Sequence, residues 1–219
     1  MEKINIDNFK RLSVNVLGVN LEGVVLVYGD TASGKTAFSL KVMEKFLREG
    51  RKVLYISTEK KTNDFERIEK IISKYPQYKD NLTIYATMDI NEIWDIINEH
   101  NADLIIVDNL EFAYKNDEKK RARNMYEFCT FLKEKTFREK SLAIITVHVY
   151  KRISYTNVEG YLTPIGGLRF YSATNVRIWL KKTPSFRKRI MNYERGEKVI
   201  EIEEGFIVGD EDDKKDINN

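Results

Sequence analysis

Short apolar runs alternate along the chain with longer stretches in which apolar residues recur every three or four positions. The runs have the length of strands, and the longer stretches have the period of amphipathic helices. The predicted strands are Leu21–Tyr28, Lys52–Ser57, Leu82–Ala86, Asp103–Asp108 and Ser141–Val147. The predicted helices are Lys35–Arg48, Thr62–Tyr75, Asn91–Glu99 and Glu118–Glu139. Because strands and helices alternate, we expect parallel pairing through crossover helices, and therefore an α/β sheet with helices on both faces.

The pattern changes after Gly166. Three short stretches with the character of strands follow, at Asn175–Lys181, Arg187–Glu194 and Lys198–Ile202, and the gaps between them have the length of turns. Such gaps favour antiparallel hairpins. The predicted fold is therefore a mostly parallel central sheet flanked by helices, with a C-terminal antiparallel extension. No linker rich in Gly, Ser or Pro divides the chain, so we expect one domain over residues 1–209 and a polar, acidic tail over residues 210–219.

The turn after the first predicted strand fits a phosphate-binding motif. Gly29-Asp30-Thr31-Ala32-Ser33-Gly34-Lys35-Thr36 matches Gly-x-x-x-x-Gly-Lys-Ser/Thr, and the strand and helix that the motif requires flank it. The glycines let the backbone curl so that N–H groups point at phosphate oxygens, and the helix start adds partial positive charge. Lys35 is predicted to reach the β- and γ-phosphates of ATP, and the Thr36 hydroxyl to ligate Mg²⁺. A chance match in a glycine turn is the alternative.

Asp108 is the second candidate for this site. It ends the apolar run Leu-Ile-Ile-Val-Asp, at the C-terminal edge of a predicted parallel strand. Open parallel sheets place their ligands at that edge, so we expect Asp108 to hold Mg²⁺ through water. An aspartate after an apolar strand is more often a helix cap or a turn residue, but its pairing with the phosphate loop favours the metal role.

Several segments, in the same order, resemble the RecA-like P-loop ATPases, and in particular the short RadB branch of the archaeal recombinases. They are GDTASGKT, VLYISTE followed by FERI, LIIVDNL, LAIITVHVY and LTPIGGLRFYSATNVRIWLKK. The resemblance extends over residues 20–209. Phosphate loops occur in many NTPases, so Glu59 and the Gly166-Gly167 segment carry the family assignment.

The resemblance implies roles for two further residues. Glu59 stands where the family's glutamate activates the water that attacks the γ-phosphate, although Lys60-Lys61 follows here in place of a glycine. His148 stands where the family's glutamine senses the γ-phosphate, because the chain has Thr146-Val147-His148 where relatives have Thr-Asn-Gln. The implied activity is ATP binding with weak Mg²⁺-dependent hydrolysis, in a protein that binds DNA and assists homologous recombination or repair. A histidine at this place also occurs in KaiC-like relatives, which leaves a regulatory ATPase acting on a protein machine, such as the archaellum motor, as the alternative.

Charge is distributed unevenly, although the net total is only +3. Lys115–Arg123 and the stretch from Tyr150 to Tyr155 occupy the places of the family's DNA loops, and Lys181–Arg195 is also basic. Glu201–Asp213, in contrast, is acidic. Cations contact phosphates and aromatic rings stack on bases, so these segments favour single-stranded DNA as the partner, alongside a recombinase or another protein. The predicted DNA contacts are Lys119, Lys120, Arg121, Arg123, Tyr150, Lys151, Arg152 and Arg187. A solvated charged surface is the alternative for each segment.

Composition limits the remaining classes of protein. Apolar residues make up 42% of the chain, which suffices for a buried core. A single cysteine, Cys129, excludes an intramolecular disulfide and disfavours a cysteine zinc site. No apolar run reaches the length of a membrane span, and the first residues lack the apolar core of a signal peptide. We therefore expect a cytoplasmic protein with no membrane span.

Overall fold

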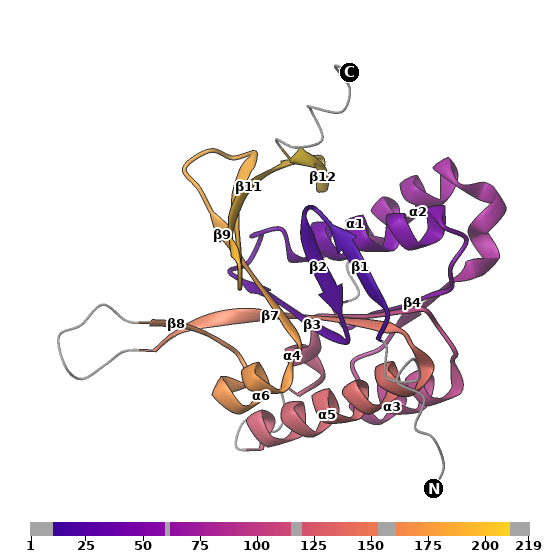
Figure 1. Cartoon of the computed structure of the whole chain (residues 1–219), viewed down its shortest axis with the longest axis horizontal. Coiled ribbons are helices and arrows are strands. Elements are labelled where there is room, and N and C mark those ends of the chain that lie inside the picture. Colours follow the sequence, from indigo (N-terminus) through magenta and orange to yellow (C-terminus); the bar gives the residue numbers. More distant parts are fainter. Residues whose placement is uncertain (1–10, 60–61, 115–119, 153–160, 211–219) are drawn as a thin grey trace, which may run out of the picture.

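The computed structural model describes residues 11–59, 62–114, 120–152 and 161–210 (Figure 1). A two-stranded hairpin consists of β1 (Ser13–Val16) and β2 (Val19–Glu22). The parallel strands of the large sheet are β3 (Val24–Gly29), β4 (Val53–Ser57), β5 (Leu82–Ala86), β6 (Leu104–Asp108), β7 (Leu142–Arg152) and β9 (Val176–Lys182). Its antiparallel strands are β8 (Tyr161–Pro164), β10 (Lys188–Tyr193), β11 (Gly196–Glu203) and β12 (Phe206–Asp210). The order across the sheet is β12-β11-β10-β9-β3-β7-β6-β4-β5, and β8 pairs with β7.

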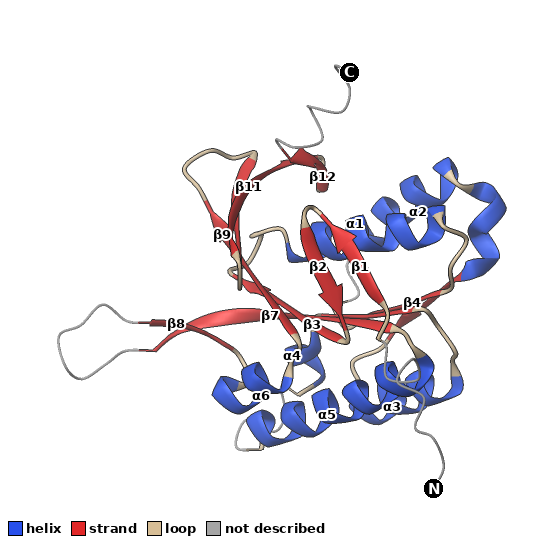
Figure 2. Cartoon of the chain, in the orientation of Figure 1, coloured by secondary structure: helices blue, strands red, loops and turns tan. Residues whose placement is uncertain are grey.

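Helices cover both faces of the parallel part of this sheet (Figure 2). One face packs against α1 (Lys35–Arg48), α2 (Thr62–Lys74) and the β1–β2 hairpin. The other face packs against α3 (Ile90–Glu99), α4 (Leu110–Ala113), α5 (Arg121–Glu139) and α6 (Gly167–Ala173). A short 3-10 helix, η2 (Pro76–Asn81), leads from α2 into β5. The predicted class of fold, a mostly parallel sheet with a C-terminal antiparallel extension, is confirmed.

The first predicted strand is in fact two strands. The break between β2 and β3 falls at Gly23, whose φ of +57° places it in the left-handed region. A Cβ on Gly23 would lie 2.6 Å from Asn175 Oδ1, so the neighbouring side chain also requires a glycine there. The apolar pattern alone gave no sign of this break, because residues on both sides of it are buried.

Strand β7 is longer than predicted and runs five residues past Val147, to Arg152. Its outer end pairs with β8 in antiparallel register, from Val149 with Pro164 to Arg152 with Tyr161. Tyr150, Lys151 and Arg152 therefore lie in a strand, and not at the start of a loop as the sequence predicted. Helix α6, β12 and the β1–β2 hairpin were not predicted either. The predicted start of α5 at Glu118, the residue Tyr155 and most of the acidic tail lie outside the described residues.

The reactivity of the Cys129 thiol can be used to test how α5 packs against the sheet. Phe128, Cys129 and Leu132 are fully buried, and burial raises the pKa of the Cys129 thiol to about 12. We therefore expect a thiol-specific disulfide reagent at about pH 8 to label the folded protein at least a hundredfold more slowly than an exposed cysteine, whose pKa is about 8.5. Labelling should become fast in guanidinium chloride, and equal rates with and without denaturant would contradict this packing.

Candidate nucleotide site

The phosphate loop joins the last residue of β3 to the first turn of α1. Inside the loop, the Ser33 N–H donates to the Asp30 carbonyl at 3.1 Å. Gly34 has a φ of +104°, which favours glycine. A Cβ on Gly29 would lie 2.2 Å from the Leu180 carbonyl oxygen, so the close approach of β9 also requires a glycine. Gly34 is thus required by the backbone conformation, and Gly29 is required because there is no room for a side chain.

Lys35 lies at the centre of the loop and is only 5% exposed. Its Nζ donates to the carbonyls of Gly29 at 3.0 Å and Asp30 at 2.9 Å. The first turn of α1 contains no acidic residue, so the ammonium group and the helix N-terminus act in the same direction. This arrangement favours an anion with several oxygens, such as a polyphosphate.

Asp108 lies at the end of β6, on the same sheet edge as the loop but separated from β3 by β7, and is almost fully buried. Parallel pairing places it across from Ser57 at the end of β4. The Tyr55 hydroxyl donates to Asp108 Oδ2 at 3.0 Å, and the Thr146 hydroxyl donates to Asp108 Oδ1. Burial raises the pKa of Tyr55, and the nearby Asp108 charge raises it further, so Tyr55 remains a hydroxyl donor. Two donors from neighbouring strands therefore fix the orientation of this carboxylate.

Glu59 is connected to the same edge through Asn109. The Asn109 side-chain amide donates to Glu59 Oε1. The Asn109 side-chain oxygen lies 2.8 Å from the Thr146 hydroxyl, whose single proton is shared between Asn109 and Asp108. The Thr58 backbone N–H donates to the Asp108 carbonyl at 2.8 Å, which holds the chain segment before Glu59 against β6. The peptide bond between Asp108 and Asn109 is cis. The hydrogen bonds of Asn109 and Thr58 hold Glu59 beside Asp108.

His148 lies next to the loop because β7 pairs with β3, in a register that sets His148 across from Gly29. Glu111, on α4, is buried and accepts a hydrogen bond from the His148 backbone N–H at 3.1 Å. The same Glu111 oxygen is hydrogen-bonded to His148 Nδ1. The other oxygen, Oε2, is buried without a hydrogen-bond partner among the described residues. Glu111 therefore fixes the imidazole and leaves its Nε2 as the ring nitrogen available to a ligand.

The structure brings together the phosphate loop, Glu59, Asp108 and His148, all four of which the sequence indicated. It adds four residues that sequence reasoning missed as parts of this site: Tyr55, Asn109, Glu111 and Thr146. A signal was present for two of these residues, since Tyr55 and Thr146 put hydroxyl groups inside otherwise apolar strands. Glu111 gave no comparable signal, because a glutamate shortly after a strand is normally an exposed residue.

The predicted DNA contacts lie on three separate elements. Lys120 immediately precedes α5 and Arg121 and Arg123 lie in its first turn, whereas Lys119 lies outside the described residues. Tyr150 is 42% exposed on β7, where Lys151 and Arg152 follow it. Arg187 lies between β9 and β10 (Figure 1). The start of α5, the β7–β8 hairpin and the loop between β9 and β10 are all toward the left of that view.

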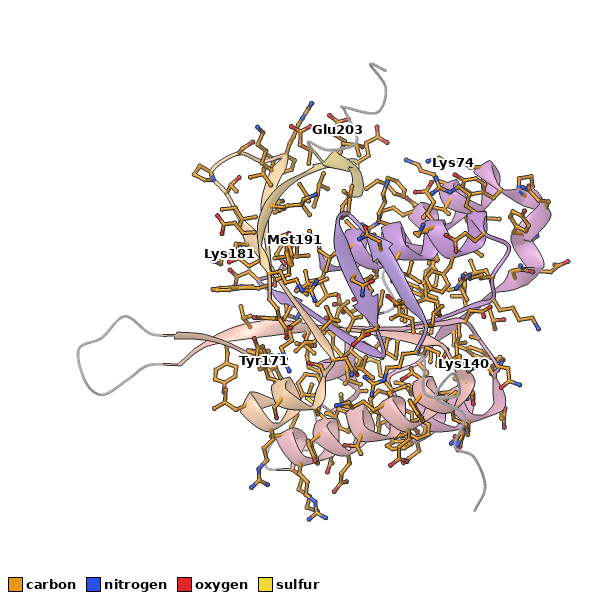
Figure 3. All side chains as sticks on the ribbon, viewed as in Figure 1. Lys74, Lys140, Tyr171, Lys181, Met191 and Glu203 are labelled. Atoms are coloured by element: carbon orange, nitrogen blue, oxygen red, sulfur yellow. The ribbon has the colours of Figure 1, made fainter. Side chains whose placement is uncertain are left out.

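Arg123 and Arg187 are paired with carboxylates. Arg123 Nε lies 2.8 Å from Glu127 Oε1, and the hydrogen bond to Glu127 together with the Glu127 charge raises the pKa of Arg123. Arg187 Nη1 lies 3.0 Å from Glu203 Oε1, near the outer end of the extension (Figure 3). All four side chains are largely exposed, so both pairs are weak enough to exchange for phosphate contacts.

The donor set fits a nucleotide with Mg²⁺. Gly29 and Gly34 let the loop pack against β9 and β11 where a Cβ would collide with them, and Lys35 supplies the charge that a polyphosphate needs. Within the described part of the chain, no group of three or more His, Cys, Asp or Glu residues gathers to hold a metal alone. Mg²⁺ normally relies on one or two protein ligands together with phosphate oxygens and water. Thr36 and Asp108 are the residues that would supply those ligands here.

Comparison with known proteins agrees with this geometry. Residues 10–152, more than half of the chain, match the AAA domain family. The chain belongs to that family. The DNA repair and recombination protein RadB of Methanobrevibacter smithii is 24% identical over 199 residues, which covers 84% of this chain and 83% of that protein. This likeness and the phosphate loop identify the chain as a RecA-like P-loop ATPase that is similar to RadB.

Solved structures show the same fold. A KaiC-like protein of Pyrococcus horikoshii has a TM-score of 0.61 at 20% identity, with 85% of this chain and 88% of that chain covered. A crystal structure of the RadB recombinase has a TM-score of 0.61 at 21% identity, and the match covers 84% of this chain and 89% of that chain. Among the described residues, no helix is both long and apolar enough to cross a membrane.

Proposed function

We propose that this RecA-like ATPase binds ATP, hydrolyses it weakly, binds single-stranded DNA and assists homologous recombination or repair in the cytoplasm. The observation that carries the proposal is the meeting of the phosphate loop with Glu59, Asp108 and His148 at one sheet edge. The likeness to RadB over most of both chains supports the part that concerns DNA.

Each residue at this edge has a distinct role in the proposal. Lys35 and the loop N–H groups bind the β- and γ-phosphates, and Thr36 and Asp108 hold Mg²⁺, which would neutralise phosphate charge. Glu59, oriented by Asn109, accepts a proton from the attacking water. His148, oriented by Glu111, presents Nε2 toward the terminal phosphate. Slow turnover is expected of the isolated chain, because RecA-like subunits often complete their sites with a neighbouring subunit.

Strand β7 offers a direct path from nucleotide to DNA. His148 lies beside the phosphate loop, and Tyr150 follows two residues later on the same strand with 42% of its surface exposed. At His148, β7 pairs with β3 on one side, and on the other the His148 carbonyl accepts from the Ile165 N–H at 2.9 Å. A small displacement at His148 would therefore be passed along the strand. We therefore propose that ATP changes the affinity of the Tyr150–Arg152 segment for DNA.

A second function is favoured by two observations. The chain has His148 where the archaeal recombinases have glutamine, and its fold is also that of a KaiC-like protein. A KaiC-like regulatory ATPase would bind ATP with the same residues but act on a protein machine. The two functions differ in whether single-stranded DNA is bound.

The proposed DNA contact predicts a specific dependence on salt. Reversing the charge of Lys151 and Arg152 to glutamate should flatten the slope of log affinity against log salt by about 1.4, because each lost phosphate contact contributes about 0.7. Tyr150→Ala should weaken binding about tenfold and keep the slope, because stacking releases few counterions. Fluorescence anisotropy with a labelled oligonucleotide measures both quantities.

Lys140 provides the matched control for these variants. It is exposed at the far end of α5, away from the β7–β8 hairpin (Figure 3). Lys140→Glu should leave both the affinity and the salt slope within about twofold of the parent, since salt screens the charge of a distant exposed side chain. An equal effect of Lys140→Glu would show non-specific attraction and contradict the proposed contact.

A further inference from the structure

Arg189 connects the C-terminal extension to the phosphate loop. It lies on β10, 157 residues after Ala32 in the sequence, and its Nη2 donates to the Ala32 carbonyl at 3.2 Å. Its Nη1 donates to the carbonyls of Phe186 at 2.9 Å and Lys188 at 2.7 Å. One guanidinium group therefore hydrogen-bonds to both the phosphate loop, at Ala32, and the β9–β10 hairpin.

The surroundings of Arg189 leave its charge available to an anion. The three hydrogen-bond acceptors are uncharged carbonyl oxygens, and the Nε atom is buried without a partner among the described residues. Burial lowers the pKa of Arg189, although an arginine stays protonated at neutral pH. A partly buried cation gains more from a phosphate than an exposed cation does, because less water competes for it.

The extension also packs against the loop through residues other than Arg189. A Cβ on Gly34 would lie 2.6 Å from Ile202 Cδ1 on β11 and 3.9 Å from Arg189 Cγ. At the outer end, Arg67 on α2 donates to the Gly205 carbonyl at 3.0 Å. Contacts made by β11 and by the turn between β11 and β12 therefore hold the extension, and with it Arg189, beside the phosphate loop.

We propose that Arg189 is a positioning residue for the nucleotide, an inference that rests on the proposed function. It holds the Ala32 peptide in the shape that the phosphates require, and it adds a positive charge beside them. Because the same group holds the Phe186 carbonyl, the bound phosphates also alter the β9–β10 hairpin. Phe186 is 92% exposed there, between Lys182 and Arg187, so the hairpin is a surface whose shape would depend on nucleotide.

The test compares Arg189→Gln with Lys188→Gln by calorimetry, with ATP, ADP and adenosine as ligands and Mg²⁺ present. Lys188 is the matched control, because it precedes Arg189 on β10 and its side chain is exposed and pairs with Glu201 at 3.9 Å. Arg189→Gln should weaken ATP and ADP about tenfold, the value of a charge-assisted hydrogen bond, and leave adenosine unchanged. Lys188→Gln should match the parent, and Arg189→Lys should recover part of the lost affinity because it keeps the charge.

Each result bears on the inference. ATP affinity in Arg189→Gln equal to that of the parent would overturn the role of Arg189 and leave the proposed function standing, whereas a parent that binds no nucleotide would remove both. An equal loss for adenosine would overturn the role of the charge. Hydrogen exchange of the parent adds a test that needs no variant: saturating ATP, but not adenosine, should change the exchange of the backbone amides of Thr183 and of residues 185–188. Unchanged exchange would overturn the link to the hairpin.

Discussion

Lys35→Ala is expected to weaken the binding of ATP with Mg²⁺ by about a hundredfold, as measured by calorimetry. The Lys35 ammonium is buried in the loop beside the positive end of α1, so alanine removes the largest positive charge that the phosphates meet. The variant also loses the hydrogen bonds to the Gly29 and Asp30 carbonyls. Those bonds lie within the loop, so the sheet and helices should keep their arrangement and the melting temperature should change little.

Lys45→Ala is the control for the loss of charge. Lys45 lies on the same helix, and its ammonium pairs with Glu49 at the protein surface at 2.9 Å. Such exposed pairs contribute little to stability or to the field at the other end of the helix. Lys45→Ala should bind ATP as the parent does. If Lys35→Ala also binds ATP as the parent does, the assignment of the phosphate loop is wrong.

Glu59→Gln is expected to lower the rate of ATP hydrolysis by about a hundredfold or more while leaving ATP affinity nearly unchanged. Glutamine keeps the shape of the side chain, and its carbonyl oxygen can still accept the Asn109 amide. The variant loses only the capacity to accept a proton from water. Phosphate release at saturating ATP measures the rate, and calorimetry measures the affinity.

The control for this variant is Glu69→Gln on the exposed side of α2. It removes the same charge from a side chain that faces solvent, so turnover should equal that of the parent. Turnover by Glu59→Gln at the parent rate would show that Glu59 does not accept the proton. Asp108 would then be the other carboxylate at that edge to examine.

The sequence predicted best where the local pattern was strong and its ends were marked. The boundaries of α1 are those predicted, Lys35–Arg48, because apolar residues recur at helical spacing and Gly34 and Gly50 stand at its two ends. Strand β5 was also predicted with its observed boundaries, Leu82–Ala86. The phosphate loop was identified because its motif fixes both the residue types and their spacing.

Features that depend on distant contacts could not be predicted. The outer end of β7 is polar and becomes a strand only because β8 pairs with it, and a sequence pattern does not show such pairing. Glu111 meets His148 across 37 residues of sequence, and Arg189 meets Ala32 across 157. These contacts arise from the register of β7 against β3 and from the packing of the extension on the loop. Hydrogen bonds between residues so far apart in the sequence can be identified only when the order of the strands in the sheet is known.

The central claim is that one chain binds single-stranded DNA in a manner that ATP controls. Fluorescence anisotropy of a labelled single-stranded oligonucleotide, at low salt with Mg²⁺, tests it most directly when the titration is run with and without ATP. We predict saturable binding whose affinity differs between the two conditions, and no such difference in Lys35→Ala. Absence of binding under both conditions would contradict the account and favour the KaiC-like regulatory ATPase instead.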